Sequence, residues 1–251
     1  MGIICVEERK QKCNNQFFES LEMGSKTIIS KDPKSLYEIE KTVIGRGQYG
    51  VVRKAYYKHD PTKVFAIKSI PKRKLGKNLE QIHAQHRALC KIDHPNIVKF
   101  YETFEDDTHF YSVMELLTGP ELVDYNDTRR ALPELEVADI MVKALSAINC
   151  LHSNGIVHRD IKPQNFHYVT KDDDAEIKLV DFGFAKLAQK DETLHTKKGT
   201  PFYIAPEVIK GSYDHRCDYW SLGIMMHELL VGKFPFGGDT TPVVLRKILK
   251  S

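Results

Sequence analysis

Three closely spaced glycines lie between two stretches that read as β-strands. Gly45, Gly47 and Gly50 have the spacing G-x-G-x-x-G inside VIGRGQYGVV, and alternating apolar residues precede and follow them. The same spacing binds dinucleotides, but there a helix follows the glycines and an acidic residue comes about 20 positions later. Here a strand follows the glycines, and position 70 is Ile70. The sequence therefore argues strongly against a dinucleotide-binding oxidoreductase.

The composition is that of an ordinary globular protein. The chain has 251 residues, 41% of them hydrophobic, which is enough for one large or two modest domains. A net charge of +3, from 37 basic and 34 acidic residues, gives no reason to expect nucleic-acid binding. Five scattered cysteines indicate a reducing compartment, and no apolar run reaches the ~20 residues of a membrane helix. We therefore expect a cytoplasmic protein.

Residues 1–34 are polar and aperiodic, as expected of a flexible leader. The leader begins MGIICV, which offers Gly2 and Cys5 for acylation, and stable membrane anchoring takes two acyl chains. Position 6 is Val6 instead of the usual serine or threonine. Membrane association through Gly2 and Cys5 and an unmodified leader therefore both stay open.

The folded part, residues 35–251, changes character along its length. A β-rich region is followed by a larger helical region, with the junction at about 115–121, which predicts an α+β fold. The predicted strands are 37–45, 51–58, 63–70, 94–106 and 108–117, and the predicted helices are 79–93, 133–155, 218–230 and 241–250.

The acidic run Asp172–Asp174 lies in the helical region. It lacks the spaced oxygen ligands and the terminal glutamate of a calcium-binding loop. The solvated turn of a hairpin explains it better, and we expect no calcium site in this chain.

Five short motifs follow one another in a fixed order. Each is weak evidence alone, because a strand-end lysine or a D-F-G triplet also occurs by chance. Their order and spacing together are specific. The motifs are GxGxxGxV at 45–52, A-I-K ending at Lys68, HRDIKPQN at 158–165, DFG at 181–183 and APE at 205–207.

With these motifs, residues 37–251 resemble a eukaryotic protein kinase of the serine/threonine type. HPNIVKFYETFED and VMELLTGPELVD resemble the calcium-dependent protein kinases of the calmodulin-kinase group. The resemblance implies a two-lobed fold, with an N-lobe at about 35–115 and a C-lobe at about 119–251. It also implies transfer of phosphate from ATP, with Mg²⁺, to serine or threonine hydroxyls of protein substrates.

The resemblance assigns roles residue by residue. Asp160 would act as base toward the acceptor hydroxyl, Lys162 would stabilise the transferring phosphoryl group, and Asn165 and Asp181 would bind Mg²⁺. Lys68 would contact the α- and β-phosphates. The nucleotide-binding residues implied are Ile44, Gly45, Gly47, Gly50, Val52, Ala66, Lys68, Met114, Glu115, Leu117 and Glu121.

Further positions concern the substrate and its regulation. Glu121 and Glu228 match acidic positions that favour basic residues near the acceptor, whereas Gln164 replaces a third acid and weakens that preference. Thr196 matches the usual activation-loop phosphorylation site, with Lys186 and Arg159 as its charge partners. Thr200 is expected to shape the surroundings of Asp160.

Three departures from the family pattern leave an alternative open. Gln85 replaces the glutamate that should pair with Lys68, and His167 replaces an apolar residue beneath the adenine. The sequence ends at Ser251, so we expect the terminal helices, the arginine that pairs with Glu207 and any calcium-binding segment to lie outside it. The alternative is a catalytically impaired, nucleotide-binding scaffold.

Overall fold

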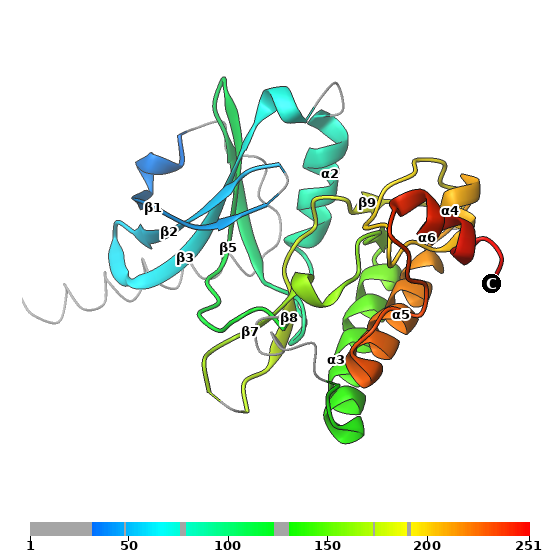
Figure 1. Ribbon diagram of the computed structural model, residues 1–251. Helices are drawn as coiled ribbons and strands as arrows, with labels where there is room; N and C mark the ends of the chain where they lie inside the picture. The colour runs from blue at the N-terminus through cyan, green and yellow to red at the C-terminus, as the bar shows by residue number, and fades with distance from the viewer. Residues whose placement is uncertain (1–31, 48, 76–78, 123–130, 173, 190–191) are drawn as a thin grey trace, which may run out of the picture. The chain divides into compact units, whose positions relative to one another are not determined.

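A computed structural model describes residues 32–47, 49–75, 79–122, 131–172, 174–189 and 192–251 (Figure 1). The predicted acylation sites Gly2 and Cys5 lie outside these residues. The chain divides into two compact units. The first contains the chain up to Lys91 together with Lys99–Leu116, and the second contains Ile92–Val98 and Leu117–Ser251.

The first unit is built on an antiparallel sheet with the strand order β1-β2-β3-β5-β4. Short 3-10 turns at Pro33–Ser35 and Lys72–Lys74 flank the first three strands. The strands are β1 (Tyr37–Arg46), β2 (Val51–Tyr57), β3 (Asp60–Pro71), β4 (Phe100–Glu105) and β5 (His109–Glu115), and the helix is α2 (Leu79–Leu89).

One face of this sheet carries an aromatic core. The ring of Tyr37 meets the rings of Phe65 and Phe104 edge to face, with centroids 5.6 and 6.0 Å apart. The hydroxyl of Tyr37 donates to the buried carboxylate of Glu102, so its polar atom is satisfied. Burying each large apolar side chain contributes about 1.5–3 kcal/mol. This core holds the strands in register.

The second unit is mainly helical, and α3 and α5 lie side by side in it (Figure 1). Ile148 and Leu151 of α3 and Met225 and Leu229 of α5 are buried in this unit. The helices are α3 (Glu134–Ser153), α4 (Pro206–Lys210), α5 (Cys217–Val231) and α6 (Thr241–Ile248), and the strands are β6 (Ile156–Val157), β7 (Phe166–Tyr168), β8 (Ile177–Leu179) and β9 (Lys186–Leu187).

The predicted elements are confirmed with shifted ends. The helix predicted over 79–93 ends at Leu89, where the N–H groups of Cys90 and Lys91 close onto the preceding turn. The strand predicted from 94 begins only at Phe100, because the preceding backbone bonds to Leu179 instead: the N–H of Val98 donates to the Leu179 carbonyl at 3.0 Å. The strand predicted from 63 begins three residues earlier, at Asp60. Among the described residues, no helix has the length and apolar character needed to cross a membrane.

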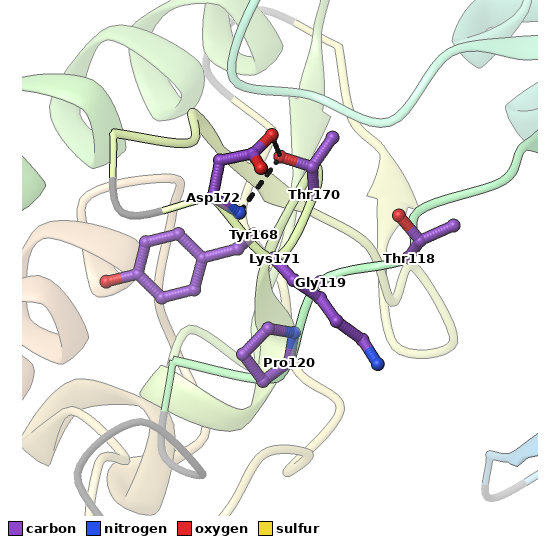
Figure 2. A pocket seen from close by; sticks show the side chains of 7 residues that line it. All are labelled: Thr118, Gly119, Pro120, Tyr168, Thr170, Lys171 and Asp172. Atoms are coloured by element: carbon purple, nitrogen blue, oxygen red, sulfur yellow. Dashed lines mark hydrogen bonds between the residues drawn. The ribbon is translucent and has the colours of Figure 1, made fainter.

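The segment after β5 runs close to the connection between β7 and β8 (Figure 2). The N–H of Thr118 donates to the carbonyl of Val169 at 3.0 Å. A Cβ on Gly119 would lie 2.2 Å from the carbonyl oxygen of Thr170 and 2.5 Å from that of Tyr168. An adjoining pocket has a volume of about 460 Å³. It is lined by Thr118, Gly119, Pro120, Tyr168, Thr170, Lys171 and Asp172. Only glycine allows this approach of two backbones.

Two glycine substitutions test this packing in opposite directions. Gly119→Ala should lower the free energy of unfolding by about 1–3 kcal/mol, because its methyl group overlaps two carbonyl oxygens. Gly223→Ala, inside α5 with no atom within 4 Å of the added Cβ, should raise it by about 0.5–1 kcal/mol. Chemical denaturation of both variants measures the two changes. Equal effects of the two substitutions would contradict this description.

Candidate active site

The register of the sheet brings four predicted nucleotide-binding residues onto one face. Lys68 on β3 lies directly opposite Val52 on β2 and Ser112 on β5, and Ala66 lies opposite Met114. Residues directly opposite each other in an antiparallel pair share a face, as do residues two apart on one strand. Val52, Ala66, Lys68 and Met114 therefore share a face with Ser112, which the sequence analysis did not identify.

The glycine-rich loop connects β1 to β2 beside this row. Gly45 pairs with Val52, and the N–H of Gly47 donates to the carbonyl of Gly50 at 3.0 Å. A Cβ on Gly50 would lie 2.2 Å from the carbonyl oxygen of Ser69, so this position requires glycine. The backbone at Gly50 therefore lies close to the backbone of β3 at Ser69, the residue after Lys68.

The other predicted nucleotide contacts of this region lie on β1 and at the end of β5. Ile44 on β1 is 49% exposed. The N–H of Glu115 donates to the carbonyl of Lys99 at 2.9 Å, so this N–H is already used within the chain. Leu117 is the next predicted contact and belongs to the second unit.

Two polar residues of α2, Gln85 and His86, are buried. Nδ1 of His86 lies 3.1 Å from Oγ of Ser112, and the His86 ring packs against Phe110 at a centroid distance of 4.8 Å. Burial, and secondarily the ammonium of Lys68, lower the pKa of His86 to about 3. His86 is therefore a neutral imidazole at physiological pH.

In the second unit, a fully buried carboxylate holds the segment that leads into Asp160. The Oδ2 and Oδ1 atoms of Asp218, on α5, accept the N–H groups of His158 and Arg159 at 2.8 and 2.7 Å. Nε2 of His152 lies 2.8 Å from Oδ2. Arg159 adopts a φ of 68°, a left-handed conformation that is costly for a residue with a side chain. Asp218 was not predicted from the sequence, because it belongs to none of the five motifs.

The carboxylate of Asp160 is itself held by three side chains. The Thr200 hydroxyl donates to Oδ1 at 2.6 Å, and Nζ of Lys162 lies 2.9 Å from Oδ2. Lys162 also donates to the Thr200 hydroxyl at 2.9 Å, and the Asn165 amide donates to the Asp160 carbonyl at 2.6 Å. Asp160 is 7% exposed. Thr200 thus contacts Asp160, as the sequence predicted.

The pairing of β7 with β8 links the segments that carry the two predicted metal ligands. Asn165 precedes β7, and its carbonyl accepts the N–H of Val180, the residue before Asp181, at 2.9 Å. Oδ1 of Asp181 also accepts the N–H of Gly183 at 3.0 Å. In the described part of the chain, no group of three or more His, Cys, Asp or Glu side chains could hold a metal ion. Two hard oxygen donors suit Mg²⁺, which commonly takes its other ligands from phosphate and water.

His167 on β7 lies across from Glu121. The two residues form a backbone bridge, and Nε2 of His167 is 3.9 Å from Oε1 of Glu121. A histidine in place of an apolar residue needs a polar partner, and Glu121 supplies a carboxylate near its ring. The carboxylate predicted to touch ribose and substrate thus has a neighbour within the chain.

The second predicted substrate acid, Glu228, lies on α5. Its Oε2 accepts the hydroxyl of Tyr203 at 2.5 Å, and burial raises its pKa. The Tyr203 ring meets the Phe234 ring edge to face at 5.4 Å. The buried Oε1 of Gln164 has no hydrogen-bond partner among the described residues. A donor from a bound substrate could satisfy this oxygen.

The segment around Thr196 is held by contacts other than phosphate. Thr196 is exposed, and its carbonyl accepts the hydroxyl of Tyr213 at 2.6 Å. Arg159 donates to the same hydroxyl at 3.4 Å. Lys186, predicted to meet a phosphate, lies 2.5 Å from the carboxylate of Glu192. Phosphorylation of Thr196 stays a prediction.

Comparison with known proteins was consistent with these motifs. A family model described as "Protein kinase domain" matches residues 37–251. Calcium-dependent protein kinase 5 of Plasmodium berghei is 40% identical over 236 residues, which are 93% of this chain and 42% of that protein. Calcium-dependent protein kinase 3 of Plasmodium yoelii yoelii is 38% identical over 86% of this chain and 40% of its own length.

A calcium/calmodulin-dependent protein kinase type 1 of Macrobrachium nipponense is 38% identical over 84% of this chain and 61% of its own length. The chain thus spans about two fifths of the length of the two Plasmodium relatives. The shared part is the region that carries the five motifs.

The buried imidazole of His86 should make stability depend on pH. Its pKa falls from about 6.5 in the unfolded chain to about 3 in the fold, so its contribution is complete above pH 6.5 and is lost as the pH falls toward 3. Between pH 7.5 and 5, wild type should lose roughly 2 kcal/mol relative to His86→Gln. Urea unfolding at both pH values measures this difference. Parallel pH profiles for the two proteins would contradict a neutral His86.

Proposed function

The chain belongs to the protein kinase domain family, and from its site we propose that it transfers the γ-phosphate of ATP to serine and threonine hydroxyls of proteins. The observation that carries this proposal is the set of hydrogen bonds around Asp160. Its carboxylate is almost buried, yet Lys162, Thr200 and Asn165 hold it in one orientation. Phosphoryl transfer depends mainly on positioning and charge, and this arrangement supplies both.

In the proposed reaction, Asp160 accepts a hydrogen bond from the substrate hydroxyl and orients its oxygen. A bond forms between that oxygen and the γ-phosphorus, the bond to the β-phosphate oxygen breaks, and ADP leaves. The hydroxyl proton passes to Asp160 and then to solvent. Lys162, 2.9 Å from Asp160, places a positive charge beside the transferring group.

The residues of both units fit ATP and Mg²⁺ by their chemistry. Lys68, on one face with Val52 and Ala66, offers a cation next to an apolar surface for a purine. Asn165 and Asp181 would hold the magnesium ion, which when bound supplies charge that neutralises phosphate oxygens. Gly45 and Gly50 have no side chains that would keep phosphate oxygens away from the backbone of the loop.

A preference for basic substrates is the finer part of the proposal. Glu228 is half-buried, and Oε1 of Gln164 has no hydrogen-bond partner among the described residues. Both oxygens suit a substrate side chain with several N–H donors, such as arginine. Lys162 two residues after Asp160 is the pattern that favours serine and threonine over tyrosine. The alternative of an impaired scaffold rests on three departures from the family pattern: Gln85, which is buried in α2, His167, and the end of the sequence at Ser251.

We also propose a cytoplasmic location, with membrane association if Gly2 and Cys5 are acylated. The support is compositional: scattered cysteines and the N-terminal MGIICV. Mass spectrometry of the protein from its native cell decides the second point, because a free amine on Gly2 would exclude the anchor.

Asp160→Asn tests the proposed chemistry. The amide keeps the size of the side chain but cannot take the proton, so phosphate incorporation into a basic serine peptide should fall about 10²–10⁴-fold. The assay measures initial rates with ATP and Mg²⁺. Asp172→Asn, in an exposed turn, serves as the control and should keep wild-type activity. Equal rates for wild type and Asp160→Asn would refute phosphoryl transfer by this site, and ATP binding without transfer by wild type would favour the scaffold.

Glu228→Gln tests the proposed substrate preference. Loss of the charge should raise the KM for a peptide with arginine before the acceptor by about tenfold, since hydrogen bonds to charged groups contribute about 1.5–3 kcal/mol. The KM for ATP and for a peptide with alanine at that position should stay unchanged. Comparing the three KM values of the variant with those of wild type checks the prediction, and an equal change for both peptides would exclude a specific contact.

A further inference from the structure

The strongest unexplained feature of the first unit is the pair of neutral polar residues buried in α2. The resemblance predicts a carboxylate partner for Lys68 at position 85, but the chain has Gln85 there. The next residue, His86, is also buried and is not part of the motifs identified in the sequence. A histidine in such a place needs a physical reason, because burying a polar ring is costly unless it is hydrogen-bonded.

The position of His86 follows from the register of the sheet. Ser112 lies directly opposite Lys68, so their side chains share a face. Nδ1 of His86 lies 3.1 Å from Oγ of Ser112, which is fully buried. The imidazole also packs against the rings of Phe110 and Phe100, at centroid distances of 4.8 and 5.9 Å. His86 is therefore held on the face from which Lys68 projects.

The charge state of His86 agrees with that position. Burial and the Lys68 ammonium both lower the pKa of His86, to about 3, so the ring is neutral at physiological pH. If Nδ1 carries the proton and donates it to Ser112, the lone pair of Nε2 remains as an acceptor. A neighbouring cation favours this tautomer.

We propose that His86 is a positioning residue for Lys68, whose ammonium it stabilises as a neutral acceptor anchored to Ser112, in place of the carboxylate that position 85 lacks. The proposal deepens, and rests on, the proposed contact of Lys68 with the phosphates of ATP.

His83 provides a matched control on the same helix. Its ring stacks on the same Phe110 ring, at a centroid distance of 5.6 Å and an interplanar angle of 23°. Its Nε2 lies 3.1 Å from Oε2 of Glu105, a residue opposite Phe110 instead of Ser112. His83 therefore packs on Phe110 as His86 does, but its hydrogen-bonding partner is Glu105 and not Ser112, the residue opposite Lys68.

The test compares His86→Phe, His86→Gln and His83→Phe in the full chain. His86→Phe should lower kcat/KM for ATP about tenfold or more, the scale of a lost hydrogen bond to a charged group, without changing the KM for the peptide. His86→Gln, which keeps a neutral acceptor, should recover most of the loss. His83→Phe should stay within about twofold of wild type.

A second readout does not depend on catalysis. Brief acylation of the folded chain with a small amine reagent, followed by mass spectrometry, reports the reactivity of Lys68 relative to the other lysines. An apolar ring beside Lys68 disfavours its charged form, so His86→Phe should raise this reactivity on the order of threefold, while His83→Phe should leave it unchanged.

The outcomes separate the two proposals. If wild type transfers no phosphate but His86→Phe alone changes the reactivity of Lys68, the proposed function fails and the role of His86 stands. If His86→Phe and His83→Phe behave alike in both readouts, the role of His86 is refuted whatever the activity. Should His86→Phe fail to fold, His86→Leu and His86→Gln are compared in the acylation readout, and equal reactivity of Lys68 in these two variants overturns the proposal.

Discussion

The buried carboxylate of Asp218 is the constraint on which the second unit's candidate chemistry depends. It has no solvent exposure, so its charge is tolerated only because the N–H groups of His158 and Arg159 and the ring of His152 surround it. These bonds fix the backbone just before Asp160, including the costly left-handed turn at Arg159. A carboxylate on a rigid helix thereby sets the direction of a loop that must hold a reactive side chain.

The register of an antiparallel sheet plays the same part in the first unit. Because opposite residues share a face, the pairing of β3 with β2 and β5 places Val52, Lys68 and Ser112 in one row. A shift by one residue would turn Lys68 to the aromatic core around Tyr37 and Phe65. The core on one face and the candidate nucleotide residues on the other are thus consequences of the same hydrogen bonds.

Features that depend on local motifs and periodicity could be predicted from the sequence. Features that depend on contacts between distant residues could not. The motifs have specific spacing, which allowed Lys68, Asp160, Asn165 and Asp181 to be predicted. Helix α3 was predicted because its apolar pattern repeats over a long segment. Asp218 and Ser112 were missed, since a single acid or serine in an apolar segment has no local signature. The end of α2 at Leu89 was misplaced because Ile92 continues the apolar period beyond the helix.

The central claim is that this chain transfers the γ-phosphate of ATP to a serine or threonine hydroxyl. The most direct measurement incubates the purified chain with Mg²⁺, γ-labelled ATP and an equimolar mixture of serine, threonine and tyrosine peptides of one basic sequence, and then identifies the labelled amino acid. The account predicts label on phosphoserine or phosphothreonine, and none when only the α-phosphate is labelled. Label on phosphotyrosine alone, or no labelled peptide with ATP bound, would contradict it.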